Sequence, residues 1–277
     1  MNTPIVLSAF GTTTRAMRTY DAIDAKARAR FPDHPVRWAY TSRMVRDRLQ
    51  KEHGLMLKPP QQVLAELHRE HYEWAVVQSL HLVCGHEFER LADETGNGPV
   101  RTSMGLPLLD SPEDYSRVIQ ILQRHHGGKD SREALVLAGH GTDHAIWAAY
   151  PALEKMAQQM LGKRVFVGVV EGWPSVEDIA QEVKHLGFGK IRLVPFMLVA
   201  GTHFREDLAG EEDSWKARFE AEGLEVAVEN HGLGRYPDIV DLFLDHIREA
   251  LDVIPERAAS PSKETISGPK RQASDLD

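Results

Sequence analysis

The chain has 277 residues, enough for two domains of ordinary size that each bury a core of their own. Hydrophobic residues make up 42% and charged residues 27%, as in ordinary globular proteins, and the net charge of −8 argues against nucleic acid as a partner. The single cysteine, Cys84, excludes an intrachain disulfide and a cysteine-based metal cluster.

Apolar runs of strand length alternate with amphipathic helical patterns along the chain. The first half predicts strands at 4–10, 35–41, 73–80 and 100–106, with helices at 13–31, 60–70, 86–96 and 112–125. The second half predicts strands at 133–139, 164–170, 189–196 and 223–229, with helices at 143–161, 175–186, 204–221 and 236–252. This alternation predicts an α/β fold of parallel sheets with helices on both faces.

The two halves repeat one another. Residues 5–13 return 130 positions later as residues 135–143, and Tyr20 then aligns with Tyr150 without a gap. We therefore predict two duplicated doubly wound domains with the active cleft between them, comprising residues 1–127 and 128–255.

Two segments lie outside the repeated pattern. His125 and His126 precede two glycines, so we interpret them as part of a solvated loop at the domain boundary. After about Pro255 the composition turns to Ser, Pro, Lys and Ala without a period, which predicts a disordered tail over 256–277.

The start lacks the pattern of an export signal, and no stretch has the roughly 18–20 apolar residues that span a bilayer. We therefore expect a cytoplasmic protein with no membrane partner.

The repeats differ in chemistry at the carboxyl ends of their strands, where ligands bind in open α/β sheets. Phe10 follows the first strand of the first half, whereas His140 stands at the same place in the second half. Glu171 follows the next strand of the second half, and His203 follows the third. With a strand order of 2-1-3-4, these three side chains would converge around His140.

Two imidazoles and one carboxylate suit a borderline divalent metal such as Co²⁺, Fe²⁺, Ni²⁺ or Zn²⁺, and three ligands leave coordination positions open. We therefore predict a metal site at His140, Glu171 and His203. Each residue also has a structural interpretation. His140 could cap its turn, Glu171 could be an acid at a helix N-terminus, and His203 could simply be exposed.

The first half offers supporting residues at the same sheet end. Glu87 occupies the position of His203, where a carboxylate could relay protons or could be a helix N-terminal acid. Arg15 and Arg43 lie nearest the strand ends and are candidates for contacting ligand carboxylates. A solvated helix face explains Arg46 and Arg48.

The turn at Gly11-Thr12 could bind an anion, but it matches neither a P-loop nor a dinucleotide fingerprint. Threonine as a helix N-cap is the commoner explanation for such a turn. We therefore expect no bound nucleotide.

Four segments of the chain stand out as motifs, namely Ser8–Thr12, Arg37–Arg43, Leu137–Thr142 and Val199–His203. These motifs resemble those of the anaerobic-pathway sirohydrochlorin cobaltochelatases, which are class II tetrapyrrole chelatases with a ferrochelatase-like fold. The likeness runs over residues 3–254. The resemblance implies a chelatase-like fold and an enzyme that inserts Co²⁺, as a substrate metal, into sirohydrochlorin or precorrin-2. This reaction belongs to cobalamin biosynthesis and uses no ATP.

The resemblance also implies roles for individual residues. His140 and His203 match the paired active-site histidines of the family, and Glu171 and Glu87 match acidic positions at or near the metal. A neutral imidazole can accept pyrrole protons, because an unperturbed histidine titrates near pH 6.5. Since the macrocycle is flat, apolar and edged by carboxylates, we expect it to contact a set of first-half residues, namely Phe10, Arg15, Ser42 and Arg43.

Other functions stay open at this point. The histidines of a non-catalytic tetrapyrrole or metal carrier would bind without turnover, and a chelatase for Fe²⁺ or Ni²⁺ would use the same donors. The carboxylates beside two histidines favour an enzyme, because a carrier needs no proton relay. A phosphate- or nucleotide-handling enzyme would need a phosphate fingerprint, which the chain lacks. The oligomeric state, including a homo-oligomer, also stays open.

Overall fold

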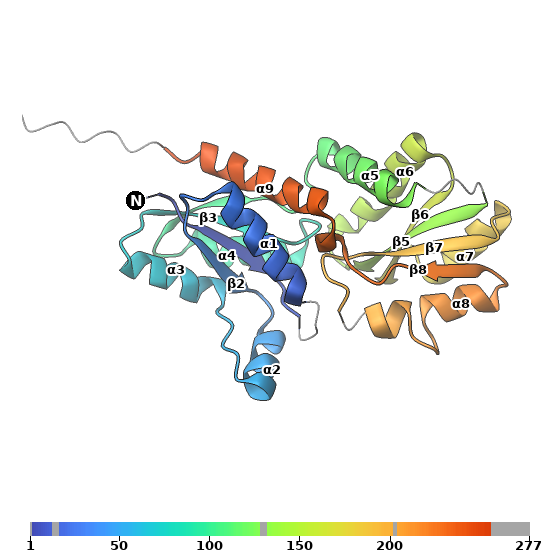
Figure 1. The fold of residues 1–277 in the computed structure, drawn as a ribbon, viewed down its shortest axis with the longest axis horizontal. Helices are drawn as coiled ribbons and strands as arrows, with labels where there is room; N and C mark the ends of the chain where they lie inside the picture. Colours follow the sequence, from blue (N-terminus) through green and yellow to red (C-terminus); the bar gives the residue numbers. More distant parts are fainter. Residues whose placement is uncertain (1, 13–16, 128–131, 202–203, 256–277) are drawn as a thin grey trace, which may run out of the picture.

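The computed structural model describes residues 2–12, 17–127, 132–201 and 204–255, which form two four-stranded parallel sheets side by side (Figure 1). The strand orders are β2-β1-β3-β4 and β6-β5-β7-β8, so the predicted order of 2-1-3-4 is confirmed in both halves. The strands are β1 (Ile5–Ala9), β2 (Val36–Tyr40), β3 (Trp74–Ser79), β4 (Arg101–Gly105), β5 (Glu133–Gly141), β6 (Val165–Glu171), β7 (Lys190–Phe196) and β8 (Glu225–Val228).

Helices connect the strands as the alternating pattern predicts. They are α1 (Met17–Arg30), α2 (Arg43–His53), α3 (Pro60–Arg69), α4 (His86–Gly96), α5 (Pro112–His126), α6 (Ala149–Leu161), α7 (Val176–His185), α8 (Trp215–Ala221) and α9 (Pro237–Asp252). Three short helical turns complete the described elements, η1 (Ala145–Ala148), η2 (Phe204–Leu208) and η3 (Leu233–Arg235). Within these residues no helix combines the length and the apolar character needed to cross a membrane.

The structure differs from the prediction in three helical regions. Helix α2 does not appear among the predicted elements, because charged and polar residues dominate its sequence and it buries only Val45 and Leu49. The helix expected at 143–161 begins as η1 before α6. The helix expected at 204–221 is divided, because the Ser214 hydroxyl accepts a hydrogen bond from the Ala217 N–H at 3.1 Å and caps a new helix, α8.

The central strands are buried on both faces, as their continuous apolar runs predict, whereas the edge strand β8 has no buried residue. Every residue of β1 is buried, and so are six consecutive residues of β5. The largest apolar cluster joins side chains of both halves, including Leu7 of β1 and Leu137 of β5. Each half also has an apolar cluster of its own, around Val77 in the first half and around Phe166 in the second. The two halves therefore share a core in addition to burying one each.

The last helix of each half packs beyond its own sheet. Helix α9 belongs to the second repeat, yet it packs on β3 and β4 of the first sheet (Figure 1). Helix α5, at the end of the first repeat, packs against α6 of the second. This exchange joins the two halves through covering helices as well as through the linker.

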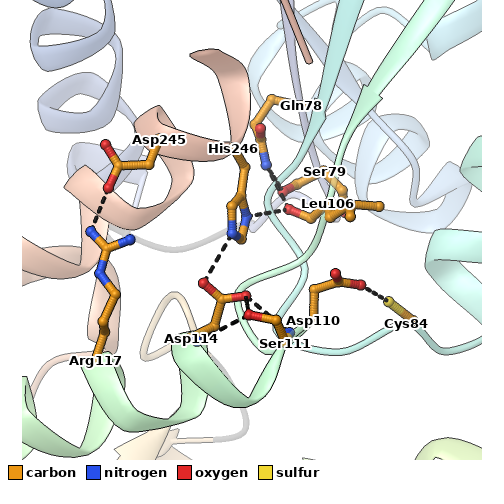
Figure 2. A network of polar contacts seen from close by, with 10 residues as sticks. All are labelled: Gln78, Ser79, Cys84, Leu106, Asp110, Ser111, Asp114, Arg117, Asp245 and His246. Carbon is orange, nitrogen blue, oxygen red and sulfur yellow. Dashed lines mark hydrogen bonds and ion pairs between the residues drawn. The ribbon is translucent and has the colours of Figure 1, made fainter. Parts of the chain in front are cut away.

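A polar network fixes α9 against the first half (Figure 2). The imidazole of His246 lies 3.0 Å from the carbonyl oxygen of Leu106 and 3.2 Å from Oδ1 of Asp114. The other oxygen of Asp114 accepts from the N–H and the hydroxyl of Ser111, completing the capping box of α5. The preceding residue of α9, Asp245, accepts from Arg117 of α5.

The interpretation of His125 and His126 as a solvated loop is wrong for the loop and for the solvation of His126, whereas His125 is exposed. Both residues belong to the last turn of α5, and His126 is buried with Nε2 2.8 Å from the hydroxyl of Tyr236. Burial is the main cause that lowers the pKa of His126 to about 4. Tyr236 lies 110 residues away, so the local sequence carries no sign of this partner. The predicted tail, 256–277, lies outside the described residues.

Candidate active site

His140 lies at the carboxyl end of β5, the strand between β6 and β7. Its side chain is exposed, and Nδ1 lies 3.3 Å from the carbonyl oxygen of Gly141. On the neighbouring strand, Glu171 pairs in register with Gly141 and is also exposed. The structure therefore brings His140 and Glu171 to adjacent strand ends, as the sequence predicts.

A glycine precedes His140 and another follows it, and close contacts leave no room for a side chain at either position. Gly141 has φ of +93°, and a Cβ there would collide with the carbonyl oxygen of Glu171. A Cβ on Gly139 would collide with the ring of Tyr150. These contacts explain why the repeated motif keeps glycine next to its variable strand-end residue.

The repeated tyrosine supports this turn in both halves. The hydroxyl of Tyr150 accepts a hydrogen bond from the Gly141 N–H at 3.3 Å. In the first half the phenol of Tyr20 likewise interacts with the backbone of Gly11. Burial raises the pKa of both phenols, so both keep their protons at neutral pH. Tyr150 therefore positions the turn that carries His140.

Two predicted site residues, His203 and Arg15, lie outside the described residues. Strand β7, which leads toward residue 203, pairs with β5 on the side opposite β6, with Phe196 in register with Gly139. The metal site of His140, Glu171 and His203 therefore stays a prediction, with its first two residues on neighbouring strands.

The predicted residues of the first half lie near the ends of β1 and β2. Phe10 follows β1 and is 42% exposed. Arg43 begins α2 with an exposed side chain, 3.5 Å from Asp47. Ser42 is buried, and its hydroxyl accepts from the Val45 N–H at 3.3 Å as the N-cap of α2. Ser42 therefore caps α2, and its contact with the substrate stays a prediction.

Glu87 is held by its own half. Its Oε2 accepts from the Thr41 hydroxyl at 3.1 Å and from the Arg90 guanidinium at 2.6 Å. These contacts tie α4 to the segment after β2, and a proton-relay role for Glu87 stays a prediction.

The interpretation of Arg46 as part of a solvated helix face is wrong. Its guanidinium donates to the carbonyl oxygens of Tyr40 at 2.6 Å and Thr41 at 2.9 Å, just beyond the end of β2. Arg48, in contrast, forms an exposed ion pair with Glu52 within α2, as that interpretation predicts.

Sequence reasoning missed two exposed tryptophans near the strand ends. Trp173 is 55% exposed two residues after Glu171, and Trp147 is 44% exposed in η1, after the turn that follows His140. Their rings form an edge-to-face pair with centroids 5.8 Å apart. Large apolar side chains in loops at a ligand-binding sheet end are a sequence signal that could have identified them.

A second group of donors was also missed. One ligand atom from each of His86, Glu89 and His144 lies within 4.8 Å of the others. The first two residues belong to α4 and the third follows β5, so the sequence separates donors that the fold places together.

Comparisons with known proteins agree with this architecture. A family model described as cobalt chelatase (CbiK) matches residues 3–252. The chain is 33% identical over 267 residues to the sirohydrochlorin cobaltochelatase of Salmonella typhimurium, covering 94% of this chain and 100% of that protein. It is 34% identical over 261 residues to sirohydrochlorin cobaltochelatase CbiKC of Nitratidesulfovibrio vulgaris, covering 90% of this chain and 91% of that protein.

Solved structures show the same fold. SirB from Bacillus subtilis with Fe³⁺ has a TM-score of 0.65 and 18% identity, over 91% of this chain and 96% of that chain. The predicted chelatase-like α/β architecture is thus confirmed. Because the family model spans nearly all of the described residues and the two relatives are similar over almost their full lengths, the chain belongs to the cobalt chelatase (CbiK) family.

Proposed function

We propose that this protein is an enzyme that inserts Co²⁺ into sirohydrochlorin without using a nucleotide. The observation that carries the proposal is the exposed His140 beside Glu171 at the ends of adjacent strands, in a chain of the cobalt chelatase family. The named activity of the two relatives supplies the substrate and the metal.

The reaction exchanges two pyrrole protons for one divalent cation, so the protein must accept protons and replace the water ligands of the metal. His140 is the proposed proton acceptor and a metal contact, since a neutral imidazole can do both. Glu171 is the proposed carboxylate that offsets the charge of the metal. His203 is the proposed second ligand and base, and Glu87 the proposed proton relay.

The macrocycle is proposed to lie against the exposed apolar side chains near these strand ends. Phe10 and Met44 come from the first half, and Trp147 and Trp173 from the second. Flat apolar rings stack favourably on such side chains.

The carboxylates at the edge of the macrocycle would then reach Arg43 and Arg15, whose guanidinium groups bind carboxylates in a bidentate way. Ser42 completes the proposed contacts. Closing both halves on a bent macrocycle would favour the half-metallated transition state.

The direct test is anaerobic incubation of the purified protein with sirohydrochlorin and Co²⁺, followed by absorbance. We expect metallation faster than in a protein-free control, with Fe²⁺ and Ni²⁺ measured in parallel to rank the metals. A rate equal to the protein-free rate would contradict the proposal. Binding of sirohydrochlorin without any acceleration would instead identify a carrier.

A further inference from the structure

The first half and the second half meet at the start of α4. Gly85 is buried just before this helix, and a Cβ on it would lie 3.4 Å from Cγ2 of Ile146 in η1. His86 and Glu89 on the first turn of α4 therefore lie against the segment that follows β5. This segment carries Asp143 and His144.

Two close contacts cross this boundary. Nε2 of His144 lies 3.0 Å from Oε1 of Glu89, and Nε2 of His86 lies 3.0 Å from Oδ1 of Asp143. The two imidazole rings are 4.8 Å apart between centroids. Four donors of the types that bind divalent metals thus meet at a surface to which both halves contribute.

The spacing fits a metal ion after small movements. Ligands about 2.1 Å from a metal lie about 3–4 Å from one another, and the three ligand atoms of His86, Glu89 and His144 already lie within 4.8 Å. His86 and Glu89 are exposed and His144 is half-buried, so their side chains have room to adjust. In the described part of the chain, Glu89 and Asp143 face these histidines and form no ion pair with lysine or arginine.

The same contacts argue for weak, exchangeable binding. Nδ1 of His144 accepts a hydrogen bond from the Ile146 N–H at 3.1 Å, so the ring proton lies on Nε2, toward Glu89. A metal at Nε2 would move this proton to Nδ1 and remove the acceptor of Ile146. Binding of the metal therefore costs one hydrogen bond, and the ligands are exposed, so the site releases its ion readily. Such release is what a site that passes a cation onward requires.

The position is close to His140 along the chain. His144 follows His140 by four residues, which span at most about 14 Å even when fully extended. An ion held at His144 and Asp143 would thus lie on the same short segment as the strand-end histidine.

We propose that His86, Glu89 and His144, with Asp143 beside them, form a second divalent-metal site that takes up Co²⁺ before it reaches His140. The metal-binding part of this proposal is independent of the proposed function, whereas the delivery part rests on it.

The binding test uses the full-length protein and Co²⁺ alone, without sirohydrochlorin. Calorimetric titration of the wild type is expected to show a weak site that is absent, or at least about tenfold weaker, in the double variant His86→Ala/Glu89→Gln. His140→Ala should retain that site. Matched controls are Asp93→Asn, an exposed acid on the same helix, and His68→Ala, an exposed histidine on α3, which should titrate like the wild type.

Identical titrations of the wild type and the double variant would overturn the proposal, provided that circular dichroism shows both folded. This result does not depend on any chelatase activity, so it is distinct from failure of the proposed function. The delivery role predicts a KM for Co²⁺ raised at least about tenfold in the double variant, with kcat unchanged at saturating Co²⁺. An unchanged KM would overturn that role.

Discussion

At the scale of single residues, the strand-end histidine is positioned by small and aromatic neighbours that the repeat preserves. Gly139 leaves room for the ring of Tyr150, and Gly141 lets the chain pass the carbonyl group of Glu171. The hydroxyl of Tyr150 then binds the Gly141 N–H. The first half keeps the same tyrosine contact around Phe10, which has no titratable group. The two repeats therefore place a titratable imidazole and an apolar ring at equivalent positions of a similar local frame.

Replacing His140 by alanine is expected to lower kcat for Co²⁺ insertion by at least about a hundredfold, the usual scale for losing a general base. Because the His140 side chain is exposed, the melting temperature should change little. Stopped-flow absorbance with sirohydrochlorin and Co²⁺ measures the rate. An unchanged rate would assign the proton acceptor to another residue.

A matched pair of variants separates positioning from stability. Tyr150→Phe and Tyr20→Phe each remove one hydrogen bond to a turn glycine, which should destabilise the fold by about 1 kcal/mol in both. Tyr150→Phe should lower kcat more than Tyr20→Phe, since only the turn that Tyr150 binds carries His140.

At the scale of helices and strands, the sequence identifies helices whose apolar residues form a clear stripe and misses one that is almost entirely polar. Helix α9 has eight buried residues and was predicted within one residue of its ends. Helix α2, in which charged and polar residues dominate, was missed. The caps of α5 and α7 are the same motif, a serine followed three residues later by an aspartate. Their surroundings differ, because Asp114 of α5 also contacts His246 of α9 whereas Asp178 of α7 lies at the surface.

This difference predicts unequal effects of one substitution at the two caps. Asp178→Ala should cost about 1 kcal/mol, the usual contribution of a cap. Asp114→Ala should cost about 2–3 kcal/mol, because it also leaves the buried His246 without its carboxylate. Urea denaturation of both variants measures these values. Equal losses would mean that the contact between α5 and α9 contributes no stability.

At the scale of the whole molecule, the exchanged helices make one folding unit of two repeats. The first sheet is covered in part by α9, which the chain reaches only after the second sheet. The largest apolar cluster correspondingly includes residues from both halves. Each half also buries a cluster of its own, but α9 and the shared cluster connect the two.

We therefore expect fragment 1–127 to lack a cooperative unfolding transition on its own, since the faces of β3 and β4 that α9 covers would be exposed to water. Mixing it with fragment 128–255, which carries α9, should restore near-ultraviolet circular dichroism and chelatase activity. A cooperative transition in isolated 1–127 would contradict this expectation. The intact chain should unfold in a single step.

Local patterns in the sequence determined much of this protein. The β-α alternation, the repeat, and the places of His140 and Glu171 at strand ends follow from periodicity and from short motifs in the chain. Such signals act over a few residues, so one sequence is enough to recognise them. The resemblance to the chelatases rests on the same short motifs. The order of strands was assumed by analogy with other doubly wound sheets, and the structure confirms it.

Only the tertiary structure decided which distant residues meet. The sequence did not reveal the exchange of α5 and α9, the burial of His126 against Tyr236, or the contact of Glu89 with His144. Glu89 and His144 are 55 residues apart, and they meet because the start of α4 packs on the loop after β5. Contacts of this kind depend on how whole elements bury their apolar faces, and no local pattern of residues specifies that packing.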